Sequence, residues 1–141
     1  MRRKILVVDD TPIVRIGTAM SLTDMGFEVD QAQSGSEALD LVKDTRYAII
    51  LMDYHMPEMD GTECARLIRS YESEIGTRTP IVCLTSDDLS EVCQDCLNAG
   101  IDACLSKTCS TAELEKMVVT WKYSRSNPIS GQPSHSQSTC P

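Results

Sequence analysis

The stretch Leu51–Gly61 reads LMDYHMPEMDG and continues an apolar run that begins at Tyr47. A continuous apolar run, unlike an alternating one, is typical of a strand buried on both faces of a parallel sheet. The run ends at Asp53, and Asp60 is a favourable residue for starting the helix that follows Gly61. This stretch therefore predicts a buried strand, a carboxylate at its carboxyl end and a tight loop into a helix.

The same order of strand and helix repeats along the chain. Four further apolar runs predict strands at Lys4–Val8, Glu28–Ala32, Ile81–Leu84 and Ala103–Leu105. Each predicted strand is followed by a segment with helical spacing of apolar residues. Five such units in succession predict an α/β fold, a doubly wound five-stranded parallel sheet with five helices on its two faces and right-handed crossovers.

Several helix starts are readable from local chemistry. Ser34 with Glu37, and Ser110 with Glu113, have the spacing of a capping box. Thr11 is expected to cap the first helix, because Pro12 suits the first helical position. Apolar positions at helical spacing then follow in that helix, at Ile13, Ile16, Gly17 and Met20.

Composition narrows the possible functions. The 141 residues are 41% hydrophobic and carry a net charge of −8. This size suits one domain, expected over residues 1–123, and the Ser/Pro-rich segment 124–141 predicts a disordered tail or linker. The acidic balance argues against nucleic-acid binding. No stretch is long enough to span a bilayer, so we expect no direct membrane contact, a cytoplasmic location and mostly reduced cysteines.

Polar residues gather where the predicted strands end. The first strand delivers Asp9 and Asp10, and the third delivers Asp53. The fourth delivers Thr85, and the fifth is followed by Lys107. Ligands of open parallel sheets bind beyond the carboxyl ends of the strands, so we expect these groups to converge there.

Three carboxylates placed together repel one another, and a hard divalent cation relieves this repulsion. Mg²⁺ takes one or two carboxylates, water and phosphate oxygens, so the cluster predicts Mg²⁺ and a phosphate ligand. Lys107 supplies a mobile positive charge and Thr85 a hydroxyl donor for phosphate oxygens. A carboxylate can itself be the nucleophile that receives a phosphoryl group.

The runs that carry this chemistry resemble the response-regulator receiver family. They are ILVVDD (Ile5–Asp10), LMDYHMPEMDG (Leu51–Gly61), VCLTS (Val82–Ser86) and SKT around Lys107. The resemblance covers about residues 4–122 in the right order and spacing. It implies a flavodoxin-like strand order 2-1-3-4-5. The Leu51–Gly61 run is most similar to receivers of hybrid histidine kinases and phosphorelays.

The resemblance also implies roles for single residues in two-component signal transduction. Asp53 would be the phosphoacceptor, and Mg²⁺ would be held by Asp9, Asp10, Asp53 and the backbone carbonyl of His55. Thr85 would be the switch hydroxyl, and Lys107 would pair with a phosphoryl oxygen. The donor would be a phosphohistidine on a histidine kinase or a histidine phosphotransfer protein. At most, such a domain catalyses its own phosphorylation and dephosphorylation, and not a reaction of an external substrate.

Four positions concern the lysine loop, the switch and the phosphoryl lifetime. The family usually has proline after the lysine, joined by a cis peptide; here Thr108 follows Lys107, and a trans bond with a reshaped loop is expected. The family often has an aromatic residue at the switch-coupling position that Cys104 occupies, so transmission by backbone and loop shifts is the hypothesis. His55 and Asp87 match the positions that tune phosphoryl lifetime.

Three other functions compete with this interpretation. An aspartyl-phosphate phosphatase would need a second acid in the D-x-D pattern, which Asp53-Tyr54-His55 lacks. A pseudo-receiver would keep the fold as a binding module without phosphorylation. A redox sensor could use the pair Cys93 and Cys96, one helical turn apart, although such spacing is equally normal in helix packing.

Overall fold

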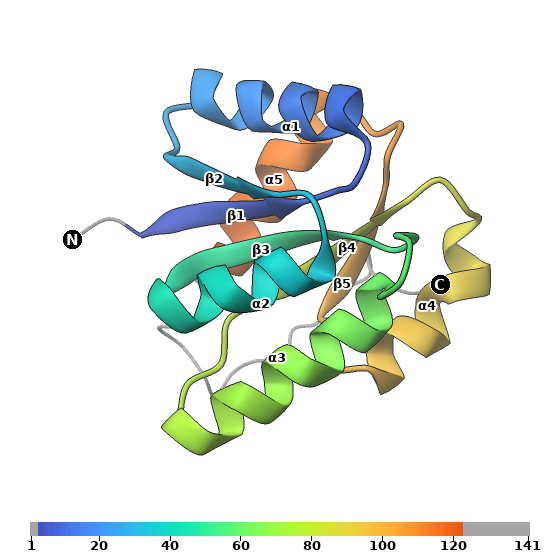
Figure 1. The fold of residues 1–141 in the computed structure, drawn as a ribbon. Coiled ribbons are helices and arrows are strands. Elements are labelled where there is room, and N and C mark those ends of the chain that lie inside the picture. The colour runs from blue at the N-terminus through green and yellow to red at the C-terminus, as the bar shows by residue number, and fades with distance from the viewer. Residues whose placement is uncertain (1–2, 123–141) are drawn as a thin grey trace.

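The computed structural model describes residues 3–122, in which strands and helices alternate throughout (Figure 1). The strands are β1 (Lys4–Val8), β2 (Val29–Ala32), β3 (Tyr47–Asp53), β4 (Ile81–Thr85) and β5 (Ala103–Ser106). The helices are α1 (Pro12–Asp24), α2 (Gly35–Asp44), α3 (Gly61–Ile75), α4 (Leu89–Asn98) and α5 (Thr111–Lys122). All five predicted strand–helix units are present, and their strand boundaries differ by one residue at most from the expected ones.

The five strands form one parallel sheet in the order β2-β1-β3-β4-β5. This confirms the doubly wound, flavodoxin-like fold. The chain runs from β1 outward to β2 and then crosses back to β3 on the other side of β1. The carboxyl ends of β1 and β3 therefore flank the point where the winding direction reverses, which is the position where ligands bind in such sheets.

Helices cover both faces of the sheet. Figure 1 shows α1 and α5 on one face and α2, α3 and α4 on the other. Two buried apolar clusters follow from this arrangement, and β3 contributes to both because all seven of its residues are buried. As its apolar stripe predicts, α5 packs inward through Leu114, Met117 and Val118.

Both predicted serine caps form, but only the Ser110–Glu113 pair completes a capping box. The Glu113 carboxylate accepts from the Ser110 amide at 2.9 Å, whereas Glu37 accepts from the Gln33 amide at 2.8 Å. The Ser34 hydroxyl accepts a hydrogen bond from the Glu37 amide at 3.1 Å, and Ser110 accepts one from Glu113 at the same distance. The Asp60 carboxylate caps α3 by accepting from the Glu63 amide at 2.9 Å. These side chains satisfy amides that the first helical turn leaves without a partner.

The prediction for the start of α1 is confirmed in position but not in its hydrogen bond. Thr11 occupies the N-cap position of α1, but its exposed side chain makes no cap hydrogen bond. Instead, the Asp9 carboxylate accepts a hydrogen bond from the Thr11 amide at 2.9 Å. A carboxylate two residues upstream can reach this amide, so an acid of the site also shapes the turn into α1.

The apolar positions noted in α1 do not form its buried face. Ile13 is 84% exposed, Ile16 44% and Met20 60%, whereas Ala19 and Leu22 are buried. At 100° per residue, Leu22 lies nearly opposite to the centre of the expected stripe, and Ala19 lies about 110° from it. Helix α1 therefore packs with its smaller apolar surface and leaves its larger one exposed.

Two further expectations concern the proposed C-terminal tail and membrane-spanning helices. The proposed tail, residues 124–141, lies outside the described residues. Within residues 3–122, none of the helices combines the length and the apolar character required to cross a bilayer.

Candidate phosphoryl-acceptor site

The predicted acids meet at the carboxyl edge of the sheet. Asp9 follows β1, Asp10 comes next, and Asp53 is the last residue of β3. Oxygen atoms of these three carboxylates all lie within 4.8 Å of one another. Asp9 and Asp53 are buried and Asp10 is half-buried. The neighbouring strands β1 and β3 bring the acids together because their parallel register aligns their carboxyl ends.

Lys107 reaches this cluster. Its Nζ lies 2.8 Å from Oδ1 of Asp53 and 3.3 Å from Oδ2 of Asp9. The peptide before Thr108 is trans, as expected, because residues 3–122 contain no cis peptide bond. The Ser106 hydroxyl accepts a hydrogen bond from the Thr108 amide at 3.1 Å and contacts its hydroxyl at 2.8 Å. This turn positions the lysine without proline.

Burial and neighbouring charges shift the pKa of Asp53 and the pKa of Lys107. Burial raises the pKa of Asp53, the hydrogen bond from Lys107 lowers it, and the charge of Asp9 raises it, with a net pKa of about 6. Burial lowers the pKa of Lys107, but the hydrogen bond to Asp53 and the charges of Asp53 and Asp9 outweigh this effect and raise it. Near neutral pH the lysine is charged and Asp53 is mostly ionised.

The donor set suits a hard cation. Oδ2 of Asp9 is buried and accepts no hydrogen bond, although it lies near Lys107. A buried carboxylate oxygen without a hydrogen bond is costly, and three carboxylates facing one ammonium group leave negative charge uncompensated. Oxygen ligands are those that Mg²⁺ prefers. The arrangement of Asp9, Asp10 and Asp53 therefore fits a Mg²⁺ site.

The Thr85 hydroxyl is close in the fold but turned into its own loop. Thr85 is the buried last residue of β4, and its Oγ1 accepts a hydrogen bond from the Asp87 amide at 3.0 Å. The backbone of Thr85 also helps to position Lys107, because its carbonyl accepts a hydrogen bond from the Lys107 amide at 2.9 Å. Because the hydroxyl oxygen accepts the bond from Asp87, it keeps its proton, and rotation of the side chain would aim that proton at another group.

His55 and Asp87 contact each other. Nε2 of His55 lies 2.7 Å from Oδ2 of Asp87, and both side chains are exposed. The contact joins the loop after β3 to the loop after β4. Sequence comparison with the family singled out both residues, but their direct contact is visible only in three dimensions.

Cys93 and Cys96, considered above as an alternative redox pair, do not bridge one another. Cys96 is a buried free thiol on α4, although its neighbour in the C-x-x-C motif is Cys93. Cys96 lies instead next to Cys83 of β4 and Cys104 of β5. Cys104, the expected coupling residue, is buried opposite Cys83 in the β4–β5 register.

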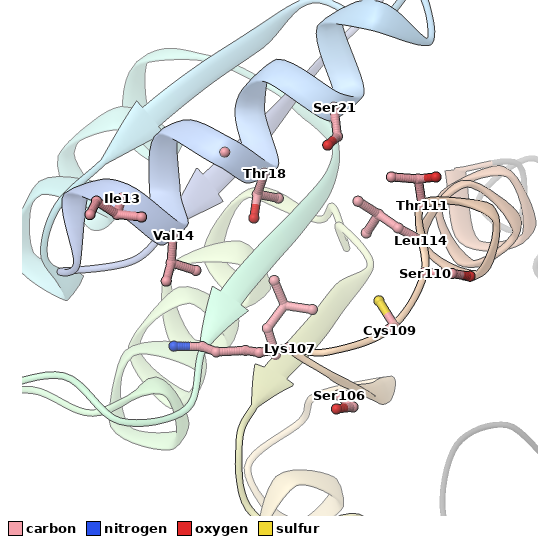
Figure 2. Close-up of a pocket in the computed structure, with 12 residues that line it drawn as sticks. Ile13, Val14, Thr18, Ser21, Ser106, Lys107, Cys109, Ser110, Thr111 and Leu114 are labelled. Carbon is pink, nitrogen blue, oxygen red and sulfur yellow. The ribbon is translucent and has the colours of Figure 1, made fainter.

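A groove of about 280 Å³ opens beside the site, between α1 and the segment that leads from β5 to α5. Figure 2 shows Val14 and Thr18 of α1 on one side of it and Cys109 and Leu114 on the other. Lys107, which contacts Asp53, lines the same groove, and so does Ile13 of α1.

Sequence reasoning missed the role of Gly61. A Cβ at this position would collide with the carbonyl oxygen of Asp53 and press on Met52 and Tyr54. The Gly61 amide donates to the Tyr54 carbonyl at 2.9 Å. The Asp60-Gly61 pair was the available signal, because it marks the place where the start of α3 packs directly against the backbone at the end of β3.

A second cluster of charged residues, which the sequence did not predict, lies at the opposite edge of the sheet. Arg69 of α3 contacts Glu72 at 2.7 Å and Asp102 at 3.0 Å, and it donates to the backbone carbonyls of Thr79 and Gly100. The Asp102 carboxylate also accepts from the Ile81 amide. Arg69 and Glu72 are one turn apart on α3, but Asp102 and the two carbonyls lie outside this helix, so helical spacing gives no sign of the whole network.

Comparisons with known proteins agree with this geometry. Residues 5–119 match the model of the response regulator receiver domain. Sensor histidine kinase RcsC of Salmonella typhi is 36% identical over 117 residues, which are 83% of this chain and 12% of that kinase. The structure of the receiver domain of the Arabidopsis thaliana histidine kinase CKI1, complexed with Mg²⁺ and BeF₃⁻, has a TM-score of 0.75 at 36% identity, covering 84% of this chain and 90% of that one.

A third comparison involves a complex. The co-crystal structure of the Saccharomyces cerevisiae histidine phosphotransfer signalling protein Ypd1 with the receiver domain of its downstream response regulator Ssk1 matches with a TM-score of 0.80. Identity is 25%, over 86% of this chain and 89% of the matched chain. The chain belongs to the response regulator receiver domain family of two-component and phosphorelay signalling.

The raised pKa of Asp53 predicts how stability depends on pH and Mg²⁺. Between the ordinary value of 3.8 and about 6, the folded protein holds a proton that the unfolded chain releases. The contribution of Asp53 to stability therefore falls as pH rises through this window. Urea unfolding with and without Mg²⁺ measures this, and Mg²⁺ should stabilise the protein above pH 6 more than below it. Equal stabilisation on both sides of that pH, or none, would contradict the prediction.

Proposed function

We propose that this domain accepts a phosphoryl group from a phosphohistidine donor onto Asp53 in a Mg²⁺-dependent reaction, and that it then changes its surface for a partner. One observation carries the proposal: Asp53 lies among carboxylates that fit Mg²⁺ and touches Lys107 at 2.8 Å. Phosphoryl transfer requires mainly positioning and charge neutralisation, and this cluster offers both.

The metal would be held by Asp10 and Asp53 directly, by Asp9 largely through water, and by the backbone carbonyl of His55. When bound, Mg²⁺ would neutralise negative charge on the carboxylates and on the phosphoryl oxygens. The CKI1 receiver structure, complexed with Mg²⁺ and BeF₃⁻, supports this assignment by similarity. Without the cation, phosphate oxygens would meet an uncompensated negative site.

In the transfer step, an Asp53 carboxylate oxygen attacks phosphorus, and the bond between phosphorus and the donor's imidazole nitrogen breaks. The product is an acyl phosphate on Asp53 and a histidine with its electron pair restored. Lys107 turns from the carboxylate toward a phosphoryl oxygen. Thr85 leaves the Asp87 amide and donates its hydroxyl to the same group, which changes the β4–α4 loop.

Partners follow from the family. Receiver domains work with histidine kinases or phosphotransfer proteins, as the Ypd1–Ssk1 complex illustrates. The relative RcsC is a sensor histidine kinase of which the matching segment is only 12%, so a place within a larger hybrid kinase is part of the proposal. We further propose residues 1–123 as the receiver and 124–141 as a tail or linker, and we propose no external substrate, nucleic acid or membrane as a partner.

Incubation with a small acyl-phosphate donor and Mg²⁺ tests the proposal. We expect intact-mass spectrometry to show the gain of one phosphoryl group, and we expect a chelator to abolish it. An alternative is a pseudo-receiver that binds partners without phosphorylation. An unmodified mass with both the small donor and phosphohistidine proteins would reject our proposal and favour that alternative.

The exposed apolar face of α1 predicts a separate effect on protein donors. Ile13, Ile16 and Met20 are exposed on the helix that borders the groove leading to Lys107. A protein donor can bury this surface, whereas a small donor cannot. We expect Ile16→Asp to slow transfer from a phosphotransfer protein by at least about tenfold, which corresponds to 1.4 kcal/mol. Labelling by the small donor should be unchanged; equal slowing with both donors would contradict docking at α1.

The contact between His55 and Asp87 predicts coupled effects on phosphoryl lifetime. These side chains join the loop after β3 to the loop after β4 and lie 2.7 Å apart. We expect His55→Ala and Asp87→Ala to change the dephosphorylation rate in the same direction, with the double variant close to either single one. Hydrolysis of the labelled protein measures this. Rates equal to that of the native protein would exclude a lifetime role.

A further inference from the structure

Three buried thiols meet on the side of the sheet that carries α4. Cys83 lies in β4, Cys104 lies opposite it in β5, and Cys96 comes from α4. Their sulfur atoms all lie within 4.8 Å of one another, and all three cysteines are free. None of the three is more than 1% exposed. This cluster has no role in the phosphoryl chemistry described above.

The spacing suits an ion bound by three sulfur atoms. With bonds of about 2.3 Å from each sulfur, three ligands lie about 4 Å apart around a planar centre and about 3.5 Å apart around a pyramidal one that keeps a lone pair. Small side-chain rotations would bring the present sulfur atoms to such a separation. Two of the ligands are held by paired strands and the third by a packed helix, so the site is largely preformed.

The apolar surroundings of the three thiols determine which ionic charge the site can accommodate. The three cysteines belong to an apolar cluster that includes Ile81, Val92 and Ile101. Three thiolates around a monovalent ion would leave two negative charges there, and a divalent ion would leave one. Charge in a dry apolar core is costly. A trivalent ion with three thiolates is neutral and requires no fourth ligand.

We propose that Cys83, Cys96 and Cys104 form a binding site for a soft trivalent ion, with trivalent arsenic as its ligand. The entering species, arsenous acid, is uncharged near neutral pH and can pass into an apolar core. The reaction is As(OH)₃ plus three thiols giving As(S-Cys)₃ plus three waters. Three As–O and three S–H bonds break, three As–S bonds form, and each thiol proton leaves in a water molecule, without oxidant or reductant.

Thiol ionisation supports the site. Hydrogen bonds from Cys83 and then Cys96 lower the pKa of Cys104, whereas the hydrogen bond to Cys104 and burial raise the pKa of Cys83. One thiol of the three is thereby prepared to attack arsenic first.

Bound arsenic would link α4 covalently to β4 and β5, the strands that end near Thr85 and Lys107. Cys83 precedes Thr85 by two residues, and Cys104 precedes Lys107 by three. A tie between these elements would oppose movement of the β4–α4 loop after phosphorylation. This consequence rests on the proposed function, whereas arsenic binding does not depend on it.

Titration of the full chain with arsenite tests the site, after reduction with a phosphine reductant that contributes no thiol. We expect one arsenic per chain by native mass spectrometry, sulfur-to-arsenic absorption and a higher melting temperature. Cys96→Ala and Cys104→Ala should each weaken binding by at least about tenfold, or 1.4 kcal/mol. Cd²⁺, which would leave the complex charged, should bind more weakly than arsenite.

Matched variants locate the binding. Cys64→Ala removes another buried free thiol, from α3, and should leave arsenite affinity unchanged. Cys93→Ala removes the other member of the C-x-x-C motif and should also leave it unchanged. Absence of binding would overturn the proposal. So would affinity that falls with Cys93→Ala but survives Cys104→Ala, because that result would assign arsenic to the helical pair. Neither measurement uses a phosphodonor, so failure here is separate from failure of phosphorylation.

Discussion

Asp53→Asn is expected to lose all covalent labelling by a small phosphodonor and by phosphohistidine proteins. An amide at this position has the shape of the carboxylate but not its nucleophilic oxygen. Asp53 is also the acid that lies 2.8 Å from Lys107. We therefore expect no neighbouring carboxylate to take its place as the nucleophile. Intact-mass spectrometry measures the label. Hydroxylamine sensitivity in the native protein checks that the label is an acyl phosphate rather than a phosphoester.

Asp60→Asn is the matched control. It makes the same chemical change in the same loop, but Asp60 caps α3 through the Glu63 amide, and asparagine is an equally good N-cap. Its labelling should equal that of the native protein. Label that persists in Asp53→Asn would identify a different nucleophile and reject the assignment. Loss of label in both variants would show a general sensitivity of the loop instead.

Arg69→Ala is expected to cause the largest loss of stability, about 3–5 kcal/mol, the range for breaking a buried ion pair. Arg69 is mostly buried and contacts Glu72 and Asp102 together with two backbone carbonyls. Removing it leaves Glu72, which is 2% exposed, with the Thr79 amide but without its cation. An unpaired buried carboxylate is the main source of the cost.

Urea unfolding measures the change. Arg66→Ala is the control, because Arg66 lies on the exposed side of the same helix and its removal should change stability by about 0.5 kcal/mol or less. Arg69→Ala should affect stability without affecting the site, since the network lies at the opposite edge of the sheet. Phosphoryl labelling of the folded variant should therefore remain. A loss of stability no larger than that of Arg66→Ala would contradict the buried ion-pair argument.

The exposed face of α1 shows one limit of sequence analysis. Ile13, Ile16 and Met20 have a regular helical spacing, but the structure buries the opposite side of the helix. Periodicity shows that residues share a face. It does not show which face meets the sheet when a helix carries apolar residues on more than one side. That choice depends on the shape of β1, β2 and α5 beneath the helix.

The amino-acid sequence by itself determined the alternation of strands and helices, the serine caps of two helices and the placement of Asp9, Asp10, Asp53, Thr85 and Lys107 at strand ends. These features are local, and parallel pairing then brings the ends to one edge of the sheet.

Only the tertiary structure decided that Lys107 touches Asp53 despite Thr108, that His55 meets Asp87, and that three cysteines share one buried space. Each of these contacts joins elements far apart in the chain. Their distances depend on how helices and loops pack across the sheet, which the spacing of residues along the sequence does not encode.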